Sequence, residues 1–496
     1  MMMRLLVATL CLFVGFSRSL GQDDPRRTAA VDVLQQVQPA VAVVFAFDEK
    51  GKRLGSGSGS VIDPRGYVLT AKHVVGKNHI VLLGGRAPVT ARLVGTMPEF
   101  DVAILKLGGA AFNRPGAPVF PRDTLPPDFL RLGVDQELKM GETIFNVGSP
   151  GGRGIVASQG IVSAVAFTGI NPLSIALQSS MSSDELIQFD AASNPGNSGG
   201  PLINLLGQQV GMTISGIHSE EGIHFAVPTN TIRHSIFEIL CSELRLGFQS
   251  GILIDEQANH VRVLSIDQSS PAFDAGLKTG DQILSVNGKP LRDPIDWAFS
   301  QNDWKPRQTL SMQVLRGQET LNVNLVLATR VPTPAIKITN VQPGVTWRSA
   351  TYDPRIPAPL GQIRRPAHSA GIVATVKALP DDASKKGLPR QDHYVLWLDG
   401  YLNIDTPGRY RLGLKSDDGS RLYVHDKLVI DNNGNHAPIL RTGWVNLDEG
   451  LHPFRIDFYE DEGNQVLELL IAQGDKELQP ITADLLFCDA AASGEP

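Results

Sequence analysis

Four features are scarce in this sequence of 496 residues: cysteine, aromatic side chains, charged side chains and long apolar runs. Cysteine occurs 3 times, aromatic residues make up 6% of the chain and charged residues 19%. No long basic run is present and the formal net charge is −6, so neither a nucleic acid nor an anionic membrane surface is an expected partner. After the N-terminal segment no stretch approaches the roughly 20 apolar residues of a membrane-spanning helix, so we expect no transmembrane segment.

The three cysteines are too few for a disulfide framework. Cys11 lies in the N-terminal segment, and Cys241 and Cys488 are far apart in sequence. We expect these last two in different domains, so two separate buried thiols are favoured over a disulfide.

The first 21 residues have the pattern of a secretion signal. Arg4 precedes an uncharged, mostly apolar run over residues 5–16, and small residues follow at Ser19 and Gly21. This pattern predicts a signal peptide over residues 1–21 that is removed on export. The mature protein is therefore expected in the periplasm or outside the cell.

Turn-forming residues are abundant, with 49 glycines and 33 prolines, and they separate short apolar or β-branched runs. Together with a length of about three domains, this pattern predicts a mainly β chain. The predicted divisions are a first domain over residues 28–244, a second over 245–329, a proline-containing linker over 330–341, a third domain over 342–488 and a tail over 489–496.

Local signals predict the elements inside these domains. In the first domain, runs over residues 41–47, 67–70, 102–107 and 161–167 read as antiparallel strands of a barrel or sandwich, between a helix from Thr28 and a helix from Pro228. In the second, Ser270 and Asp293 begin short helices and Asn287-Gly288 makes a hairpin turn. Strict alternation from Tyr410 and from Phe454 predicts a third domain that is nearly all β.

Three segments of the first domain bring a histidine, an aspartate and a serine into one chain order. His73 follows an apolar strand, Asp101 precedes another, and Ser198 lies within Asn194–Leu202, which is rich in glycine. A serine hydroxyl is a poor nucleophile until an imidazole takes its proton and a carboxylate holds that imidazole in the right tautomer. Each residue alone is ordinary in a loop or turn, but the three together predict a base, an orienting acid and a nucleophile.

The glycines around Ser198 indicate a separate task. Gly196 allows a sharp backbone turn, so that its N–H and the N–H of Ser198 can point at one spot. Two such donors would stabilise an oxyanion, which makes Gly196 and Ser198 the predicted oxyanion hole.

These motifs resemble the trypsin-like proteases of the HtrA/DegP family over Gly55–Leu244, and Gly55–Thr70 is similar to the stretch before that family's histidine. The resemblance implies a trypsin-like double β-barrel with His73 as general base, Asp101 as its orienter and Ser198 as nucleophile. It also implies a serine endopeptidase that cleaves unfolded or damaged proteins as a homo-oligomer and requires no cofactor.

The sequence departs from the digestive trypsin-like proteases at positions that determine which side chains are accepted as substrate. Ala192 stands six residues before the nucleophile, where a trypsin-type pocket has an acid, so basic side chains should not be preferred. Met212 and Ile214 are expected to make that specificity pocket apolar.

The second domain resembles a protease-associated PDZ domain through Ser269–Ala272, Ala275–Asp281 and Ile283–Gly288. Such domains bind a peptide C-terminus through backbone amides, and Leu246, Gly247 and Phe248 best match that carboxylate loop. The stretch Ser250–Leu253 is a rival. A third alternative is a domain that only packs against the protease.

The third domain resembles the β-barrel module named after anthrax protective antigen. Gly400-Tyr401-Leu402, Pro407–Tyr410 and Ser416–Leu422 carry this resemblance. In that family two consecutive aspartates bind calcium and thereby a sugar, and Asp417 and Asp418 occupy the matching place. The same Asp-Asp-Gly is also an ordinary hairpin turn, which we favour because calcium needs six to eight oxygen ligands.

The sequence thus predicts an exported serine endopeptidase with peptide capture by the second domain and carbohydrate or cell-surface targeting by the third. Two alternatives stay open. One is a polysaccharide or cell-surface binding protein with vestigial proteolysis. The other is a chaperone whose cleavage is secondary.

Overall fold

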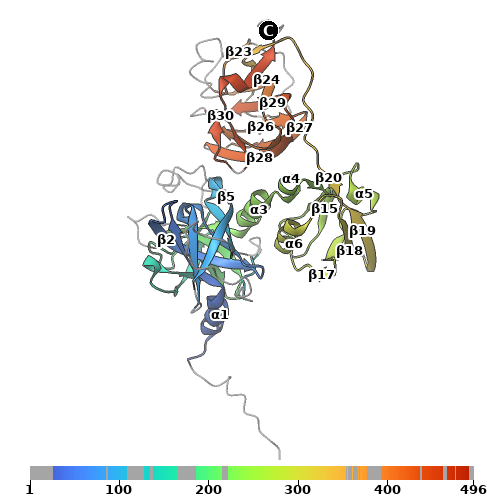
Figure 1. Ribbon diagram of the computed structural model, residues 1–496. Helices are drawn as coiled ribbons and strands as arrows, with labels where there is room; N and C mark the ends of the chain where they lie inside the picture. The colour runs from blue at the N-terminus through green and yellow to red at the C-terminus, as the bar shows by residue number, and fades with distance from the viewer. Residues whose placement is uncertain are drawn as a thin grey trace, which may run out of the picture.

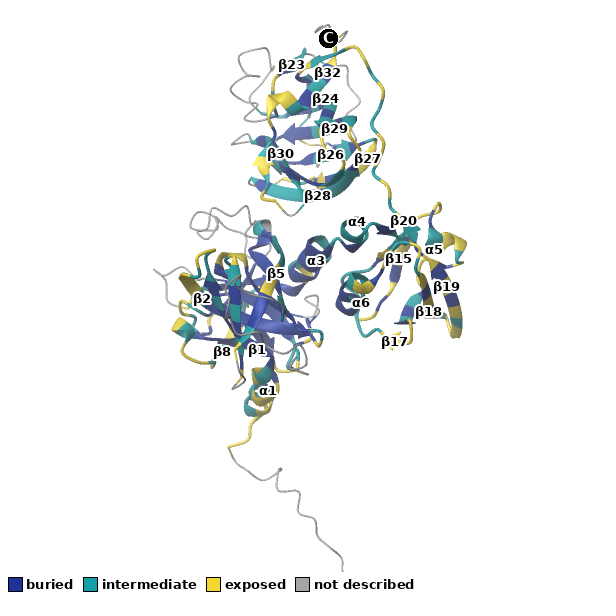
Figure 2. Cartoon of the chain, in the orientation of Figure 1, coloured by how far each residue is buried: buried dark blue, intermediate teal, exposed yellow. Residues whose placement is uncertain are grey.

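The computed structural model contains three folded units in chain order (Figure 1). It describes residues 26–490, except 85–87, 109–127, 134–137, 166–185, 215–221, 354, 356–359, 361–366, 368, 377–391, 436–437, 462–465 and 475. The predicted signal peptide and most of the predicted tail therefore lie outside the described residues. Buried residues gather inside each unit in Figure 2, so each unit has a core of its own.

The first unit begins with a closed six-stranded barrel in the order β1-β2-β3-β6-β5-β4, with every neighbouring pair antiparallel. Its strands are β1 (Val41–Phe47), β2 (Arg53–Asp63), β3 (Tyr67–Ala71), β4 (Asn78–Leu83), β5 (Val89–Met97) and β6 (Val102–Leu107). Aliphatic side chains such as Val44, Leu69 and Ile104 are fully buried inside it. The predicted strands over residues 41–47, 67–70 and 102–107 are confirmed.

A second closed barrel follows, in the order β10-β11-β12-β9-β8-β7. Its strands are β7 (Thr143–Gly148), β8 (Val156–Ala164), β9 (Ile187–Phe189), β10 (Pro201–Asn204), β11 (Gln209–Ile214) and β12 (His224–Pro228). The strand predicted over residues 161–167 begins earlier, at Val156, because its small and polar residues pair with β7 without an apolar pattern. Its predicted end lies among residues that are not described.

Two helices flank the barrels as predicted. The helix α1 (Ala29–Val37) begins at Thr28, whose side-chain oxygen accepts a hydrogen bond from the Val31 amide at 3.3 Å. The helix α3 (Thr229–Leu240) buries Ile232 and Ile236 against the first core, which its apolar stripe predicts.

The second unit is built from short strands and three short helices. The strands are β13 (Phe248–Gln249), β14 (Ile252–Ile254), β15 (Val263–Ile266), β16 (Gln282–Val286), β17 (Lys289–Pro290), β18 (Thr309–Arg316), β19 (Glu319–Val326) and β20 (Ala328–Thr329), and the helices are α4 (Ser242–Leu246), α5 (Pro271–Asp274) and α6 (Pro294–Ser300). Ser270 caps α5 and Asp293 caps α6. Asn287 and Gly288 both have positive φ between β16 and β17, as the predicted hairpin turn requires.

The helix α6 attaches the second unit to the first barrel. Ile295, Ala298 and Phe299 of α6 belong to the same buried cluster as the first barrel, and the rings of Phe299 and Tyr67 stack with centroids 3.9 Å apart. Beside them Arg65 contacts both Asp63 at 2.7 Å and Asp296 of α6 at 2.6 Å. The junction is therefore both apolar and ionic.

The third unit is a sandwich of two antiparallel sheets, one of eight and one of four strands. Its strands are β21 (Val341–Pro343), β22 (Val345–Thr351), β23 (Ser369–Val373), β24 (Tyr394–Ile404), β25 (Gly408–Ser416), β26 (Ser420–Val424), β27 (Lys427–Asn432), β28 (Ile439–Leu447), β29 (Gly450–Glu460), β30 (Leu467–Gln473), β31 (Gln479–Pro480) and β32 (Leu486–Asp489). Tyr410, Leu412, Phe454 and Ile456 point into one core between the sheets, as their alternation predicts.

The segment predicted as a linker is bonded at both ends. The Arg330 amide donates to the Gly247 carbonyl at 2.9 Å, and the amides of Thr333 and Ile336 donate to carbonyls of the third unit. The third unit then returns to the first: β28 faces α3 and β5 in Figure 1, and the Arg441 guanidinium lies 5.4 Å from the Phe100 ring centroid.

Both remaining cysteines are free thiols, as expected. Cys488 is buried in the third unit and Cys241 lies at the end of α3. Burial raises the pKa of the Cys241 thiol to about 12, so its reactive thiolate is scarce at neutral pH.

Candidate functional site

His73 and Asp101 are brought together by the ends of two paired strands. His73 lies in the 3-10 turn η2 (Lys72–Val74) directly after β3, and Asp101 lies between the 3-10 turn η3 (Pro98–Phe100) and β6. The Asp101 carboxylate accepts from the His73 backbone N–H at 2.9 Å and contacts its Nδ1 at 2.7 Å. Asp101 is 4% exposed and has φ +54°, so a buried carboxylate is held in one orientation against the imidazole.

The loop between β9 and β10 brings Ser198 close to the turn that carries His73. The amide of Ser58, in β2 of the first barrel, donates to the Ser198 carbonyl at 2.8 Å. A Cβ atom built on Gly57 would lie 2.9 Å from that carbonyl oxygen and 2.5 Å from the Val74 side chain, next to His73. The serine loop and the histidine turn therefore meet at Gly57, and all three predicted triad residues lie around one junction of the barrels.

Gly196 makes the sharp backbone turn that its sequence context predicts. Its φ is +107°, and a Cβ atom there would lie 2.6 Å from the Gly151 amide nitrogen and the Ser149 carbonyl oxygen. Only glycine fits this turn. Donation by the amides of Gly196 and Ser198 to an oxyanion stays a prediction.

The predicted specificity-pocket residues differ in how far they are exposed to solvent. Ala192 is exposed, and its carbonyl accepts from Asn146 Nδ2 at 3.0 Å and from the Ser158 hydroxyl at 2.6 Å. Met212 and Ile214 are fully buried within the first core. Strand β11 is buried on both faces, so sequence alone could not assign an inward side, and the pocket stays a prediction.

Ser58 is a site residue that the sequence analysis did not single out. Its hydroxyl donates to the Gly196 carbonyl at 2.6 Å and accepts from the Ser149 amide at 2.8 Å. Its carbonyl accepts from the Thr70 hydroxyl at 2.7 Å. The alternating glycines and serines of β2 were the available signal, because small residues in a strand permit another backbone to approach closely.

The carboxylate loop predicted in the second unit is internally bonded. The Gly247 amide donates to the Glu243 carbonyl at 3.0 Å, and Phe248 is buried and paired with Thr329 in β20. In the rival stretch, the Ser250 amide and hydroxyl both donate to the Glu243 carboxylate. Peptide capture by Leu246, Gly247 and Phe248 stays a prediction, and it requires some of these bonds to open.

Asp417 and Asp418 lie in the turn between β25 and β26. Both are buried, Asp418 has φ +59°, and its carboxylate accepts from the Asp461 amide at 2.7 Å. Burial and the two aspartates raise the pKa of the neighbouring Glu460 carboxyl to about 9. Across the described part of the chain no three acidic, histidine or cysteine side chains form a metal-binding group. The choice between a calcium site and an ordinary turn at Asp417 and Asp418 stays a prediction.

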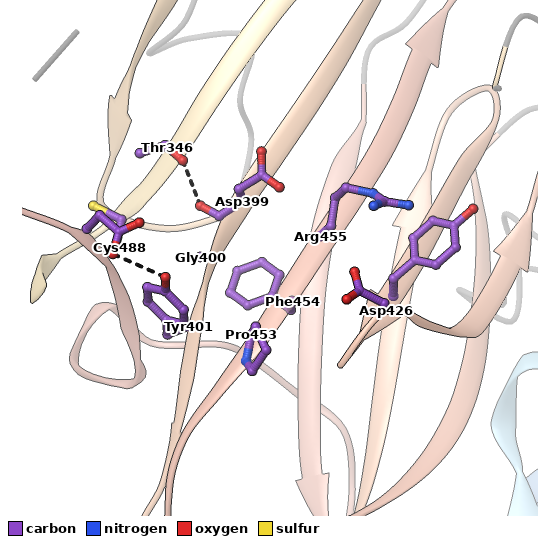
Figure 3. A pocket seen from close by; sticks show the side chains of 11 residues that line it. Thr346, Asp399, Gly400, Tyr401, Asp426, Pro453, Phe454, Arg455 and Cys488 are labelled. Carbon is purple, nitrogen blue, oxygen red and sulfur yellow. Dashed lines mark hydrogen bonds between the residues drawn. The ribbon is translucent and has the colours of Figure 1, made fainter. Parts of the chain in front are cut away.

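A small cavity of about 190 Å³ lies elsewhere on the third unit (Figure 3). Tyr401 and Arg455 come from the paired strands β24 and β29, and Phe454 lies between them. The Tyr401 hydroxyl donates to the Asp489 carboxylate at 3.1 Å. The Arg455 guanidinium stacks 4.1 Å from the Tyr423 ring centroid. Aromatic faces beside carboxylates and an arginine make this a polar hollow with room for one small ring.

Comparison with known protein families agrees with this three-part structure. Residues 57–212 match the trypsin-like peptidase domain, residues 249–327 the PDZ domain and residues 343–480 the PA14 domain. The chain therefore carries a trypsin-like peptidase domain, a PDZ domain and a PA14 domain, and the fold class predicted from the sequence is confirmed.

Individual relatives match part of the chain. Probable periplasmic serine endoproteases described as DegP-like are similar to this chain: the protein of Ectopseudomonas mendocina is 33% identical over 295 residues, which are 55% of this chain and 56% of the relative. The protein of a Marinomonas species is 32% identical over 310 residues, or 58% and 60% of the two chains. This chain thus spans just over half the length of the curated relatives it matches.

One solved structure, the serine endoprotease of Yersinia pestis, is 26% identical and covers 61% of this chain and 98% of its own, with a TM-score of 0.35. Within the described residues, no helix has the length and apolar character needed to cross a membrane.

Proposed function

We propose that this chain is an exported serine endopeptidase in which Ser198, His73 and Asp101 form the catalytic triad. The observation that carries the proposal is the 2.7 Å contact between His73 Nδ1 and the buried Asp101 carboxylate, beside a Ser198 loop held on β2. The similarity to periplasmic DegP-like endoproteases supports both the reaction and the compartment.

The proposed chemistry follows from this arrangement. Asp101 holds a proton on Nδ1 of His73, which leaves Nε2 as the basic nitrogen that takes the Ser198 hydroxyl proton during attack on the peptide carbonyl. The tetrahedral oxyanion would accept from the Gly196 and Ser198 amides. His73 then returns the proton to the leaving amine, and water repeats the sequence to release the acyl group.

Replacement of the nucleophile tests this proposal. Ser198→Ala should lower kcat for casein hydrolysis by about 10⁶-fold, because base and orienter cannot act without it. A fluorophosphonate should label the wild type but not this variant. Ser269→Ala, on the surface of the PDZ domain, is the control and should retain both labelling and turnover. Wild-type hydrolysis by Ser198→Ala would show that the site is elsewhere.

The PDZ domain is proposed to capture peptide C-termini for the protease, and the substrates are proposed to be unfolded or damaged proteins. Homo-oligomer formation is a further part of this proposal. If the chain is instead mainly a chaperone, Ser198→Ala should still suppress aggregation of a denatured protein at the wild-type ratio of chain to client.

The PA14 domain is proposed to bring the protease to a carbohydrate or another cell-surface ligand. The hollow at Tyr401, Tyr423 and Arg455 supports this role, because aromatic faces and carboxylates together suit a sugar ring and its hydroxyls. A glycan array with the whole protein, and with Tyr401→Ala, tests it: binding lost in this variant while casein hydrolysis continues is the expected result. Glycan binding that Tyr401→Ala does not reduce would assign it to another surface.

A further inference from the structure

A groove between the peptidase domain and the PA14 domain begins beside the proposed triad. Its volume is about 710 Å³. Lys72 and Val75 on either side of His73 line it, as does Pro98, which opens the turn that leads to Asp101. On the opposite side it is lined by Arg411 from β25 and by Lys476 and Glu477 that follow β30. The two segments that carry the proposed base and orienter therefore form one wall, and the PA14 domain forms the other.

Arg411 has an unsatisfied hydrogen-bond donor at this groove. Arg411 is only 7% exposed, and its Nε has no hydrogen-bond partner. The Trp444 ring lies 5.8 Å from its guanidinium, but no carboxylate of the described chain pairs with it. Glu238 also borders the smaller adjoining cavity of about 180 Å³ that Arg411 lines. A buried guanidinium N–H without an acceptor is unfavourable, so this position favours a carboxylate brought by a ligand.

The chemistry of the triad indicates which part of a substrate lies here. His73 gives its proton to the leaving amine, so the first residue of the leaving half lies beside His73. The groove starts at the residues flanking His73. Leu54 and Leu93, which are 60% and 38% exposed, supply apolar surface along it. An extended segment with apolar residues and one carboxylate would match this lining.

We propose that the PA14 domain completes the substrate groove of the peptidase and that Arg411 binds a carboxylate on the leaving half of the substrate. This inference rests on the proposed peptidase function and adds a substrate class to it. The carboxylate is either an acidic side chain or the terminal carboxylate of a short leaving segment. Both present the same planar pair of oxygens to a guanidinium.

Matched peptides test the proposal on the whole protein. In one series an aspartate is moved along the leaving half of a fluorogenic peptide, with asparagine at the same position as its partner. In a second series the peptide ends in a free carboxylate or an amide. At one position the wild type should cleave the acidic member with a kcat/KM roughly tenfold higher, through a lower KM, as expected for a charge-assisted hydrogen bond. The series that shows the preference identifies the source of the carboxylate.

Variants then assign the preference to Arg411. Arg411→Gln should remove the discrimination between aspartate and asparagine while the asparagine peptide is cleaved at the wild-type rate, and Arg411→Lys should retain part of it. Arg421→Gln is the matched control, because Arg421 lies in the same domain but away from the groove. Its Nε pairs with the Asp431 carboxylate at a distance of 3.1 Å. Thermal denaturation checks that the PA14 domain of each variant is folded.

A binding assay gives a readout independent of turnover. Fluorescence anisotropy of the labelled leaving-half peptide with Ser198→Ala should show tighter binding of the acidic member, and Arg411→Gln in that background should abolish the difference. Equal cleavage and equal binding of both members by the wild type would overturn the role of Arg411 and leave the peptidase proposal intact. Failure to cleave any peptide or casein would overturn both.

Discussion

The PDZ and PA14 domains meet the peptidase domain in contrasting ways. The PDZ domain inserts α6 into the first core, with Phe299 stacked on Tyr67 and Asp296 paired with Arg65. The PA14 domain contacts it at Arg441, whose guanidinium lies on the Phe100 ring, and leaves cavities along the boundary. A tightly packed junction holds two domains in a fixed arrangement, whereas a junction with cavities has room for a ligand. We therefore expect the PDZ domain to be fixed on the peptidase domain and the boundary with the PA14 domain to be open to substrate.

The largest effect is expected from breaking the filled junction. Phe299→Ala removes a fully buried ring from the shared cluster, which should destabilise the protein by about 3–5 kcal/mol. Scanning calorimetry should show the peptidase and PDZ domains unfolding in one transition in the wild type and in two in the variant. Phe273→Ala, at an exposed phenylalanine of the same PDZ domain, is the control and should leave the single transition in place. A wild type that already shows separate transitions would contradict a rigid junction.

A second experiment identifies the unfolding transition of the PA14 domain by its dependence on pH. Burial and the nearby Asp418 and Asp417 raise the folded-state pKa of Glu460 from 4.5 to about 9. Between these values the folded state binds a proton that the unfolded state lacks, so this contribution is full below pH 4.5 and is lost as the pH rises through about 9. Glu460→Gln should therefore raise the PA14 melting temperature by a few degrees at alkaline pH.

The pH dependence provides the check on that variant. Wild type and Glu460→Gln should melt alike near pH 5, and only the PA14 transition should differ as the pH is raised. A wild-type PA14 transition that strengthens from neutral to alkaline pH would contradict a protonated Glu460. Titration calorimetry with calcium tests the favoured interpretation of Asp417 and Asp418 as an ordinary turn, which predicts no binding there.

The smallest effect is expected at the PA14 boundary. Arg441→Gln removes the cation–π contact with the Phe100 ring, worth about 0.5–1 kcal/mol. The melting temperature of each domain should be almost unchanged, while small-angle scattering should report a broader distribution of PA14 positions. A loss of stability as large as that of Phe299→Ala would show that the two junctions are equivalent after all.

Local signals in the sequence predicted much of this structure. Thr28, Ser270 and Asp293 each begin a helix, and the predicted strands over residues 41–47 and 102–107 match β1 and β6. These features depend on neighbours in the chain, so capping and periodicity reveal them. The residue types and order of the proposed triad were visible for the same reason, and the structure brings His73 and Asp101 into contact.

Long-range contacts were not predictable in this way. Ser58 bridges two barrels through Gly196, which lies 138 residues later in the chain. The sequence indicates only that α6 belongs to the PDZ domain. In the structure, however, Phe299 of α6 is stacked on Tyr67 of the peptidase domain. Met212 and Ile214 lie in a strand buried on both faces, where alternation gives no direction. Such features depend on how domains and barrels dock, which no local pattern in one sequence encodes.

The path of the chain through Arg330 and Thr333 has a consequence for the weak PA14 contact. The domains follow one another from peptidase to PDZ to PA14, and the last returns to the first at Phe100, so the chain closes a ring. A tethered partner is present at an effective concentration in the millimolar range, so a contact with a Kd of about 1 mM is half occupied. The same affinity would be undetectable between separate molecules at cellular concentrations. The ring can therefore open and reclose around a substrate without the chain losing its third domain.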